Sequence, residues 1–126
     1  MNNIVWIIDD DRSIRWVLEK ALGREGIDHA SFSSAGDALA ELERHRADLA
    51  IVDLELRAGS GLGVLGALHE RPADFGGLGA VVFSNHAHPV VRSRCLNLGA
   101  VAFFDKSFQT DELLEFVQRA AEKRPG

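Results

Sequence analysis

The 126-residue sequence has a single cysteine, Cys95, and no apolar N-terminal run that follows a basic start. One thiol cannot form an internal disulfide, and without such a run neither a secretory signal nor a membrane span is indicated. We therefore expect a soluble, cytoplasmic protein. The sequence also lacks a set of cysteine and histidine ligands, which disfavours a zinc site.

Positive charge is scarce as well. The formal net charge is -5, with 14 lysines and arginines against 19 acidic residues. Binding to nucleic acid depends on a basic surface that neutralises phosphates, and this chain has no basic excess to form one. We expect no direct contact with nucleic acid.

Apolar residues make up 46% of the chain, enough for one compact domain over residues 1–126. Continuous apolar runs that end abruptly in polar residues are typical of buried strands. Three such runs predict strands at Ile4–Ile8, Leu49–Val52 and Ala80–Phe83, and two shorter stretches predict strands at Asp28–Phe32 and Val101–Phe104.

Helical spacing fills the intervals between these strands. Apolar residues recur at i, i+3, i+4, i+7 and i+8 from Ile14 and again from Leu113. Ser34, followed three residues later by Asp37, indicates a helix start, and Pro89 suits a first helical turn. Weaker patterns predict helices at 35–44, 62–70 and 89–98. Strand and helix thus alternate five times, which predicts a parallel sheet covered by helices on both faces.

In an open parallel sheet, side chains just beyond the carboxyl ends of the strands converge on one crevice. Here those positions carry acids after the first, third and fifth strands, a hydroxyl after the fourth, and an amine beside the last acid. They are Asp9, Asp10, Asp11, Asp53, Glu55, Ser84, Asp105 and Lys106. Converging carboxylates repel one another, so a cation usually holds them, and ligation by oxygen alone suits Mg²⁺.

These residue types fit phosphoryl transfer. A carboxylate can attack phosphorus to give an acyl phosphate when a metal and fixed cations neutralise the transferring oxygens. Asp53 is the best nucleophile because it ends a central strand. Asp9 and Asp10 would hold the metal, while Ser84 and Lys106 would bond phosphoryl oxygens.

Residues 7–15, IIDDDRSIR, resemble the opening of a response-regulator receiver domain, particularly in the nitrogen-regulation class of activators. The motifs IVDL at 51–54 and FDK at 104–106 follow at the spacing of that family. The segment 84–107 is more similar to free-standing receivers. The resemblance covers nearly the whole chain and implies a flavodoxin-like (βα)5 doubly wound sheet with strand order 2-1-3-4-5.

The resemblance also implies a function. Asp53 would accept the phosphoryl group from a phosphohistidine on a sensor histidine kinase or a histidine phosphotransfer protein. The chain would catalyse only its own phosphorylation and dephosphorylation, and would act on an output domain or protein that the sequence does not identify. Asp53 and Asp10 would ligate one Mg²⁺, with Asp9 acting largely through water and Glu55 through its backbone carbonyl.

Ser84 and Phe103 match the switch pair of that family, in which a hydroxyl moves toward the phosphoryl group and an aromatic ring turns inward. The signalling face would be the fourth helix, the fifth strand and the fifth helix. Arg94 and the loop through His88 lie where members of the family commonly dimerise or meet targets, so a homodimer is one state that the resemblance allows.

The chain departs from the family pattern beside the site. Ser107 follows Lys106 where a cis proline is usual, and a cis bond before serine would cost about 3 kcal/mol. We therefore expect a trans bond or a looser loop, which affects the reach of Lys106. Asn85 stands where a small residue is usual. Glu55 and His86 occupy variable positions, which predicts an altered lifetime of the phosphoryl group without fixing its direction.

Three other functions fit the sequence less well. Residues 53–55 loosely resemble the Asp-x-Asp motif of haloacid-dehalogenase-type hydrolases, although that family places its nucleophile after the first strand. A pseudo-receiver that binds partners without phosphorylation fits Ser107 and Asn85 but does not need the retained acidic and basic set. A nucleotide-binding protein is disfavoured because no Gly-x-Gly-x-x-Gly follows the first strand.

Simple structural roles are expected for the remaining notable residues. Asp11 is predicted to cap the first helix. Trp6 and Trp16 are predicted to pack rather than to recognise a partner, and Cys95 to be a small, partly buried apolar group.

Overall fold

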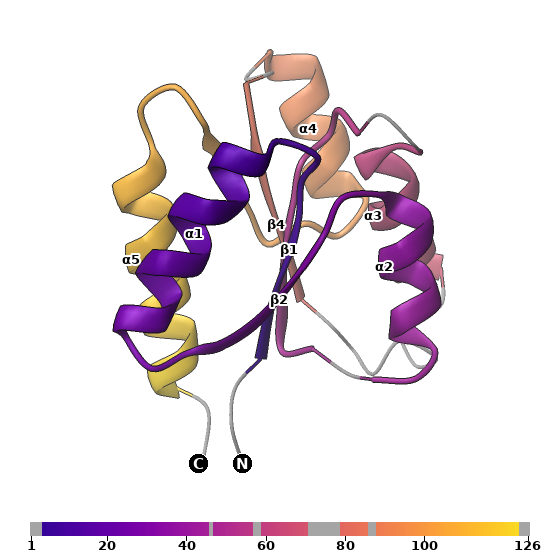
Figure 1. Cartoon of the computed structure of the whole chain (residues 1–126). Coiled ribbons are helices and arrows are strands. Elements are labelled where there is room, and N and C mark those ends of the chain that lie inside the picture. Colours follow the sequence, from indigo (N-terminus) through magenta and orange to yellow (C-terminus); the bar gives the residue numbers. More distant parts are fainter. Residues whose placement is uncertain (1–3, 46, 57–58, 71–78, 86–87, 124–126) are drawn as a thin grey trace.

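A computed structural model describes residues 4–45, 47–56, 59–70, 79–85 and 88–123. Within these ranges strands and helices alternate (Figure 1). The strands are β1 Ile4–Ile8, β2 Asp28–Phe32, β3 Leu49–Val52, β4 Gly79–Ser84 and β5 Ala102–Asp105. The helices are α1 Arg12–Arg24, α2 Ala35–Leu42, α3 Gly61–Glu70, α4 Pro89–Asn97 and α5 Thr110–Lys123.

The strands form one parallel sheet in the order β2-β1-β3-β4-β5, which confirms the predicted flavodoxin-like topology. Helices α1 and α5 cover one face, and α2, α3 and α4 cover the other (Figure 1). The register aligns Ile8 with Val52 and Val52 with Val82. The carboxyl ends of the three central strands therefore lie side by side, at the edge where this fold places its ligands.

Both faces of the sheet are apolar. In β3, Leu49 and Ile51 pack toward α1 and α5, whereas Ala50 and Val52 pack toward α2, α3 and α4. Burial on both faces explains why the central strands are continuous apolar runs without polar alternation.

The predicted bounds of β1, β2 and β3 are confirmed, while β4 is longer at both ends and β5 lies one residue later than expected. Helix α1 starts at Arg12 because an Asp11 carboxylate oxygen accepts hydrogen bonds from the Ser13 and Ile14 N–H groups at 2.9 and 3.2 Å. Ser34 caps α2 as predicted. None of the helices in the described ranges is long and apolar enough to cross a membrane.

The prediction that both tryptophans pack is confirmed for Trp6 and wrong for Trp16. Trp6 is 2% exposed and its ring lies 4.7 Å from that of Phe32, but Trp16 is 59% exposed. The buried side of α1 runs through Leu18 and Leu22, and two residues on a helix correspond to about 200° of rotation, which turns Trp16 away from Leu18. Its ring contacts the Lys20 ammonium group instead.

Candidate functional site

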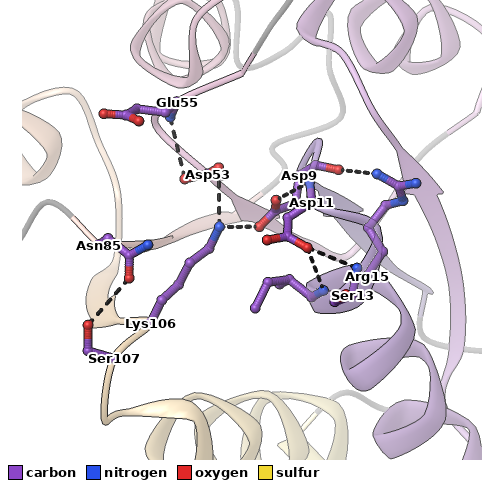
Figure 2. A network of polar contacts seen from close by, with 10 residues as sticks. Asp9, Asp11, Ser13, Arg15, Asp53, Glu55, Asn85, Lys106 and Ser107 are labelled. Atoms are coloured by element: carbon purple, nitrogen blue, oxygen red, sulfur yellow. Dashed lines mark hydrogen bonds and ion pairs between the residues drawn. The ribbon is translucent and has the colours of Figure 1, made fainter.

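A polar pocket of about 330 Å³ lies at the carboxyl edge of the sheet. Its lining residues are Asp10, Asp11, Asp53, Glu55, Leu56, Ser84, Asn85 and Lys106. Asp9 is buried beside it, and its carboxylate faces Lys106 (Figure 2). The predicted convergence of these side chains is therefore present, apart from Asp105.

Backbone hydrogen bonds carry the sheet one residue beyond the strand ends and fix the site residues in place. The Asp53 N–H donates to the Ile8 carbonyl at 2.9 Å, and the Asp9 N–H donates to the Phe32 carbonyl at 3.0 Å. The Lys106 N–H donates to the Ser84 carbonyl at 3.1 Å. The acidic and basic side chains thus project from a rigid edge.

Lys106 lies between two carboxylates (Figure 2). Its Nζ is 2.7 Å from Asp9 Oδ2 and 3.2 Å from Asp53 Oδ2, and its side chain is 8% exposed. Burial alone would lower the pKa of Lys106, but the hydrogen bonds and charges of the two aspartates outweigh it and raise that pKa. The ammonium group therefore stays charged at neutral pH.

The two carboxylates respond in the same way to their buried surroundings. Burial raises the pKa of Asp9 and of Asp53 above the ordinary value, and the opposing interactions with Lys106 only partly offset it. Ionised carboxylates in this position are costly, so additional positive charge stabilises them.

The geometry fits a small cation. One carboxylate oxygen from each of Asp9, Asp10 and Asp53 can be chosen so that all lie within 4.8 Å of one another. The donors are all oxygens, which is the ligand chemistry of Mg²⁺. Glu55 lines the pocket and contributes its N–H, which donates to Asp53 Oδ1 at 3.4 Å, while its carboxylate points away from Asp53 in Figure 2.

The two residues of the predicted switch pair lie on neighbouring strands. Ser84 is fully buried at the end of β4, and Phe103 on β5 is 5% exposed within the apolar layer of α2, α3 and α4. The guanidinium carbon of Arg92 on α4 lies 5.6 Å from the centre of the Phe103 ring. Phe104 faces the other layer, where its ring lies 5.7 Å from that of Phe116, so both phenylalanines pack against apolar neighbours.

Residues 5–118 match the family described as the response regulator receiver domain. The chain belongs to this family. The receiver is 33% identical over 116 residues to the DNA-binding transcriptional regulator NtrC of Proteus hauseri, a match that covers 92% of this chain and 24% of that protein. It is 29% identical over 123 residues to the response regulator TodT of Pseudomonas putida, covering 98% of this chain and 53% of TodT. The receiver thus spans about a quarter of the length of NtrC.

Solved structures agree with this assignment. A CheY-like receiver domain protein from Methanospirillum hungatei superposes with a TM-score of 0.85 at 27% identity, covering 98% of this chain and 96% of that one. NtrX from Brucella abortus gives a TM-score of 0.82 at 25% identity, covering 97% of the receiver and 27% of NtrX. Receiver domains are signalling modules that typically do not act as enzymes on a separate substrate.

Hydrogen bonds among its own residues hold the loop after Lys106. The Lys106–Ser107 bond is trans, like the other peptide bonds in the described ranges. The Ser107 N–H donates to Asp105 Oδ1 at 2.7 Å, and the Asp105 N–H donates to Gln109 Oε1 at 2.9 Å. A proline at position 107 has no N–H to donate. Asp105, which we expected in the acidic cluster, holds this loop and does not line the pocket.

The two departures from the family pattern contact each other. Asn85 lines the pocket, and the Ser107 hydroxyl donates to Asn85 Oδ1 at 3.4 Å (Figure 2). The loops after β4 and β5 are therefore joined at the rim of the site. His86, which with Glu55 occupies a variable position of the family, lies outside the described residues.

Two residues that support the site were missed by sequence reasoning. The Arg15 guanidinium donates from Nη1 to the Asp9 carbonyl at 2.8 Å, and Gly61 packs against the backbone that follows Asp53. Arg15 lies in the string that resembles receivers, but nothing in the sequence indicates the direction of its side chain. The packing of Gly61 depends on a contact between α3 and the end of β3 and carries no sequence signal beyond the glycine itself.

Proposed function

We propose that this receiver accepts a phosphoryl group on Asp53 in a Mg²⁺-dependent reaction, from the phosphohistidine of a sensor histidine kinase or a histidine phosphotransfer protein. The observation that carries the proposal is the contact of one ammonium group, Lys106, with both Asp9 and Asp53 beside an open polar pocket. A haloacid-dehalogenase-type reaction fits less well, because Asp53 follows β3 and that family uses the first strand.

Asp9, Asp10 and Asp53 would hold the metal, together with the backbone carbonyl of Glu55. When bound, Mg²⁺ supplies positive charge that neutralises the oxygens of the transferring group and the surrounding carboxylates. The proximity of the three carboxylates supports this assignment. In such a complex Lys106 no longer has to neutralise two carboxylates alone.

In the proposed step, an ionised oxygen of Asp53 attacks phosphorus and the phosphorus–nitrogen bond of the phosphohistidine breaks. The imidazole nitrogen leaves with the electron pair, and the product is an acyl phosphate on Asp53. Lys106 then pairs with one phosphoryl oxygen, and the Ser84 hydroxyl donates to another. The raised pKa of Lys106 keeps its positive charge available for this contact.

The signalling face would be α4, β5 and α5. Ser84 reports the state of Asp53, and Phe103 on the adjoining strand packs in the same apolar layer as Cys95 of α4. Movement of Ser84 toward a phosphoryl group would therefore change the packing between β5 and α4. An output domain, an output protein or a second copy of the receiver would bind to this face.

The test is intact mass spectrometry after incubation with Mg²⁺ and acetyl phosphate. We expect the parent to gain the mass of one phosphoryl group, and Asp53→Asn to gain none. Asp28→Asn is the matched control, because Asp28 is exposed at the start of β2, whereas the site lies at the carboxyl ends of the strands. If the parent stays unmodified while Mg²⁺ still binds, the phosphoacceptor proposal fails and a phosphorylation-independent interaction module becomes the better description.

A further inference from the structure

The start of α3 lies directly against the peptide bond that follows Asp53. A β-carbon placed on Gly61 would be 2.0 Å from the Asp53 carbonyl oxygen and 2.7 Å from the Leu54 α-carbon. Real β-carbons essentially never approach other atoms within 3.0 Å. These neighbours are backbone atoms, so a side chain at position 61 would force α3 and the end of β3 apart.

Backbone conformation does not explain this glycine. Gly26, Gly59 and Gly99 are the described residues with positive φ, and Gly61 is not among them. Alanine is the better helix former at an ordinary helical position. Gly66 in the same helix has open space where its β-carbon would lie. Close approach to Asp53 is therefore the feature that requires glycine at position 61.

Further contacts join the end of β3 to the start of α3. The Gly61 N–H donates to the Leu54 carbonyl at 3.2 Å, and Glu55 and Ser60 form an isolated antiparallel bridge. On its other side the Asp53 backbone is held by the hydrogen bond to Ile8 in β1. The chain from Asp53 to Glu55 is thus fixed between β1 and α3.

We propose that Gly61 is a positioning residue for the phosphoacceptor. Its lack of a side chain seats α3 on the Asp53–Leu54 peptide, and this contact sets the direction of the Asp53 carboxylate and of the Glu55 backbone. Gly61 itself does not touch the phosphoryl group. The inference rests on the proposed phosphorylation of Asp53, because the positioning matters only for a reaction at that carboxylate.

The experiment compares Gly61→Ala with Gly66→Ala, which adds the same methyl group to the same helix where there is room for it. ¹⁹F NMR of the complex with beryllofluoride and Mg²⁺ reports the surroundings of the Asp53 carboxylate in folded molecules. We expect shifted fluorine resonances in Gly61→Ala and parental resonances in Gly66→Ala. The phosphorylation rate at saturating acetyl phosphate should fall about tenfold or more in Gly61→Ala, since a misplacement of about 1 Å can cost about 100-fold.

A purely structural role would lower the folded fraction of Gly61→Ala without moving the fluorine resonances of the molecules that remain folded, and that result would overturn the proposal. Equal effects of the two substitutions would overturn it too. If the parent forms no adduct, the proposed function fails, and the positioning role fails with it. If Gly61→Ala does not fold, amide NMR of the parent replaces the comparison. Beryllofluoride should then shift the Leu54 and Gly61 resonances but not that of Gly66, and unmoved Leu54 and Gly61 resonances would exclude the role.

Discussion

Along their length, β1, β3 and β4 present apolar side chains to both helical layers, whereas the positions at their carboxyl ends are polar and buried. Ile8 and Val52 are fully buried in the apolar layer of α2, α3 and α4, and the residue that follows each of them is an aspartate whose pKa burial raises. Apolar burial stabilises the folded chain, while burial of a carboxylate opposes folding unless a cation compensates. The interior of the sheet therefore supplies the stability, and the edge uses part of it to hold reactive groups.

Substitutions at the edge and in the interior should differ in how their effects depend on pH and Mg²⁺. We expect substitutions at the edge to couple to pH and to Mg²⁺. Substitutions in the interior should change stability alone.

The largest effect is expected for Lys106→Met. Removing one partner of a buried ion pair costs about 3–5 kcal/mol, because the carboxylates of Asp9 and Asp53 lose their compensating charge. Mg²⁺ should bind more tightly to this variant, since Lys106 no longer competes for the same oxygens. Urea unfolding with and without Mg²⁺ measures both effects. Lys20→Met, on the exposed side of α1, is the control. If Lys106→Met lost as much stability in acid, where the carboxyls are protonated, as at neutral pH, the explanation would be wrong.

Within the interior, Ile7→Ala should lower the free energy of unfolding by about 2–5 kcal/mol, because Ile7 is fully buried between β2 and β3. Its Mg²⁺ affinity, measured by calorimetry on the folded protein, should equal that of the parent. Val17→Ala, at a side chain that is 42% exposed, should change stability by less than about 0.5 kcal/mol. A weakened Mg²⁺ affinity in Ile7→Ala would show that interior and edge are not separable.

The loop after β5 allows a finer comparison at one position. Ser107→Pro removes the N–H that donates to the buried Asp105 carboxylate, which should cost about 1–3 kcal/mol. Ser107→Ala keeps that N–H and loses only the long hydroxyl contact with Asn85, so its cost should stay under about 0.5 kcal/mol. Thermal unfolding of the two variants measures the difference. Equal stability would mean that Asp105 does not depend on this donor.

The smallest effect, and the one gain, is expected for Asp53→Asn without divalent cations. Because the pKa of Asp53 is raised in the folded state, the contribution of this carboxyl to stability is greatest below the ordinary value of 3.8 and is lost as the pH rises through the raised pKa. The asparagine variant does not titrate at this position and should therefore be the more stable protein at neutral pH. Melting temperatures measured across pH should show this advantage vanish in acid. At neutral pH, saturating Mg²⁺ should make the parent the more stable protein, because only the parent offers the ion this carboxylate.

Much of this architecture could be predicted from the sequence. The strands β1 and β3 are uninterrupted apolar runs, so their bounds were evident, and the rule that parallel strands end at one edge brought Asp10, Asp53 and Lys106 together. Arguments from spacing work where a regular element fixes the direction of a side chain. The roles assigned to these residues remain predictions until phosphorylation is measured.

The features that sequence reasoning missed depend on contacts between segments. Trp16 is exposed because of its angle on α1, which the general expectation for a large aromatic did not take into account. Asp105 turned out to support its own loop because the N–H of Ser107 lies within reach of its carboxylate. The approach of Gly61 to Asp53 depends on how the start of α3 packs against the end of β3, which no periodicity describes.

Cys95 gives the receiver a built-in chemical reporter. This sole cysteine of the sequence is fully buried on the inner side of α4, and burial raises the pKa of its thiol. An alkylating reagent can therefore reach the sulfur only during transient separation of α4 from the sheet. The labelling rate then gives the frequency of that opening, and comparing it with and without beryllofluoride would show whether occupancy of Asp53 loosens or tightens the proposed signalling face.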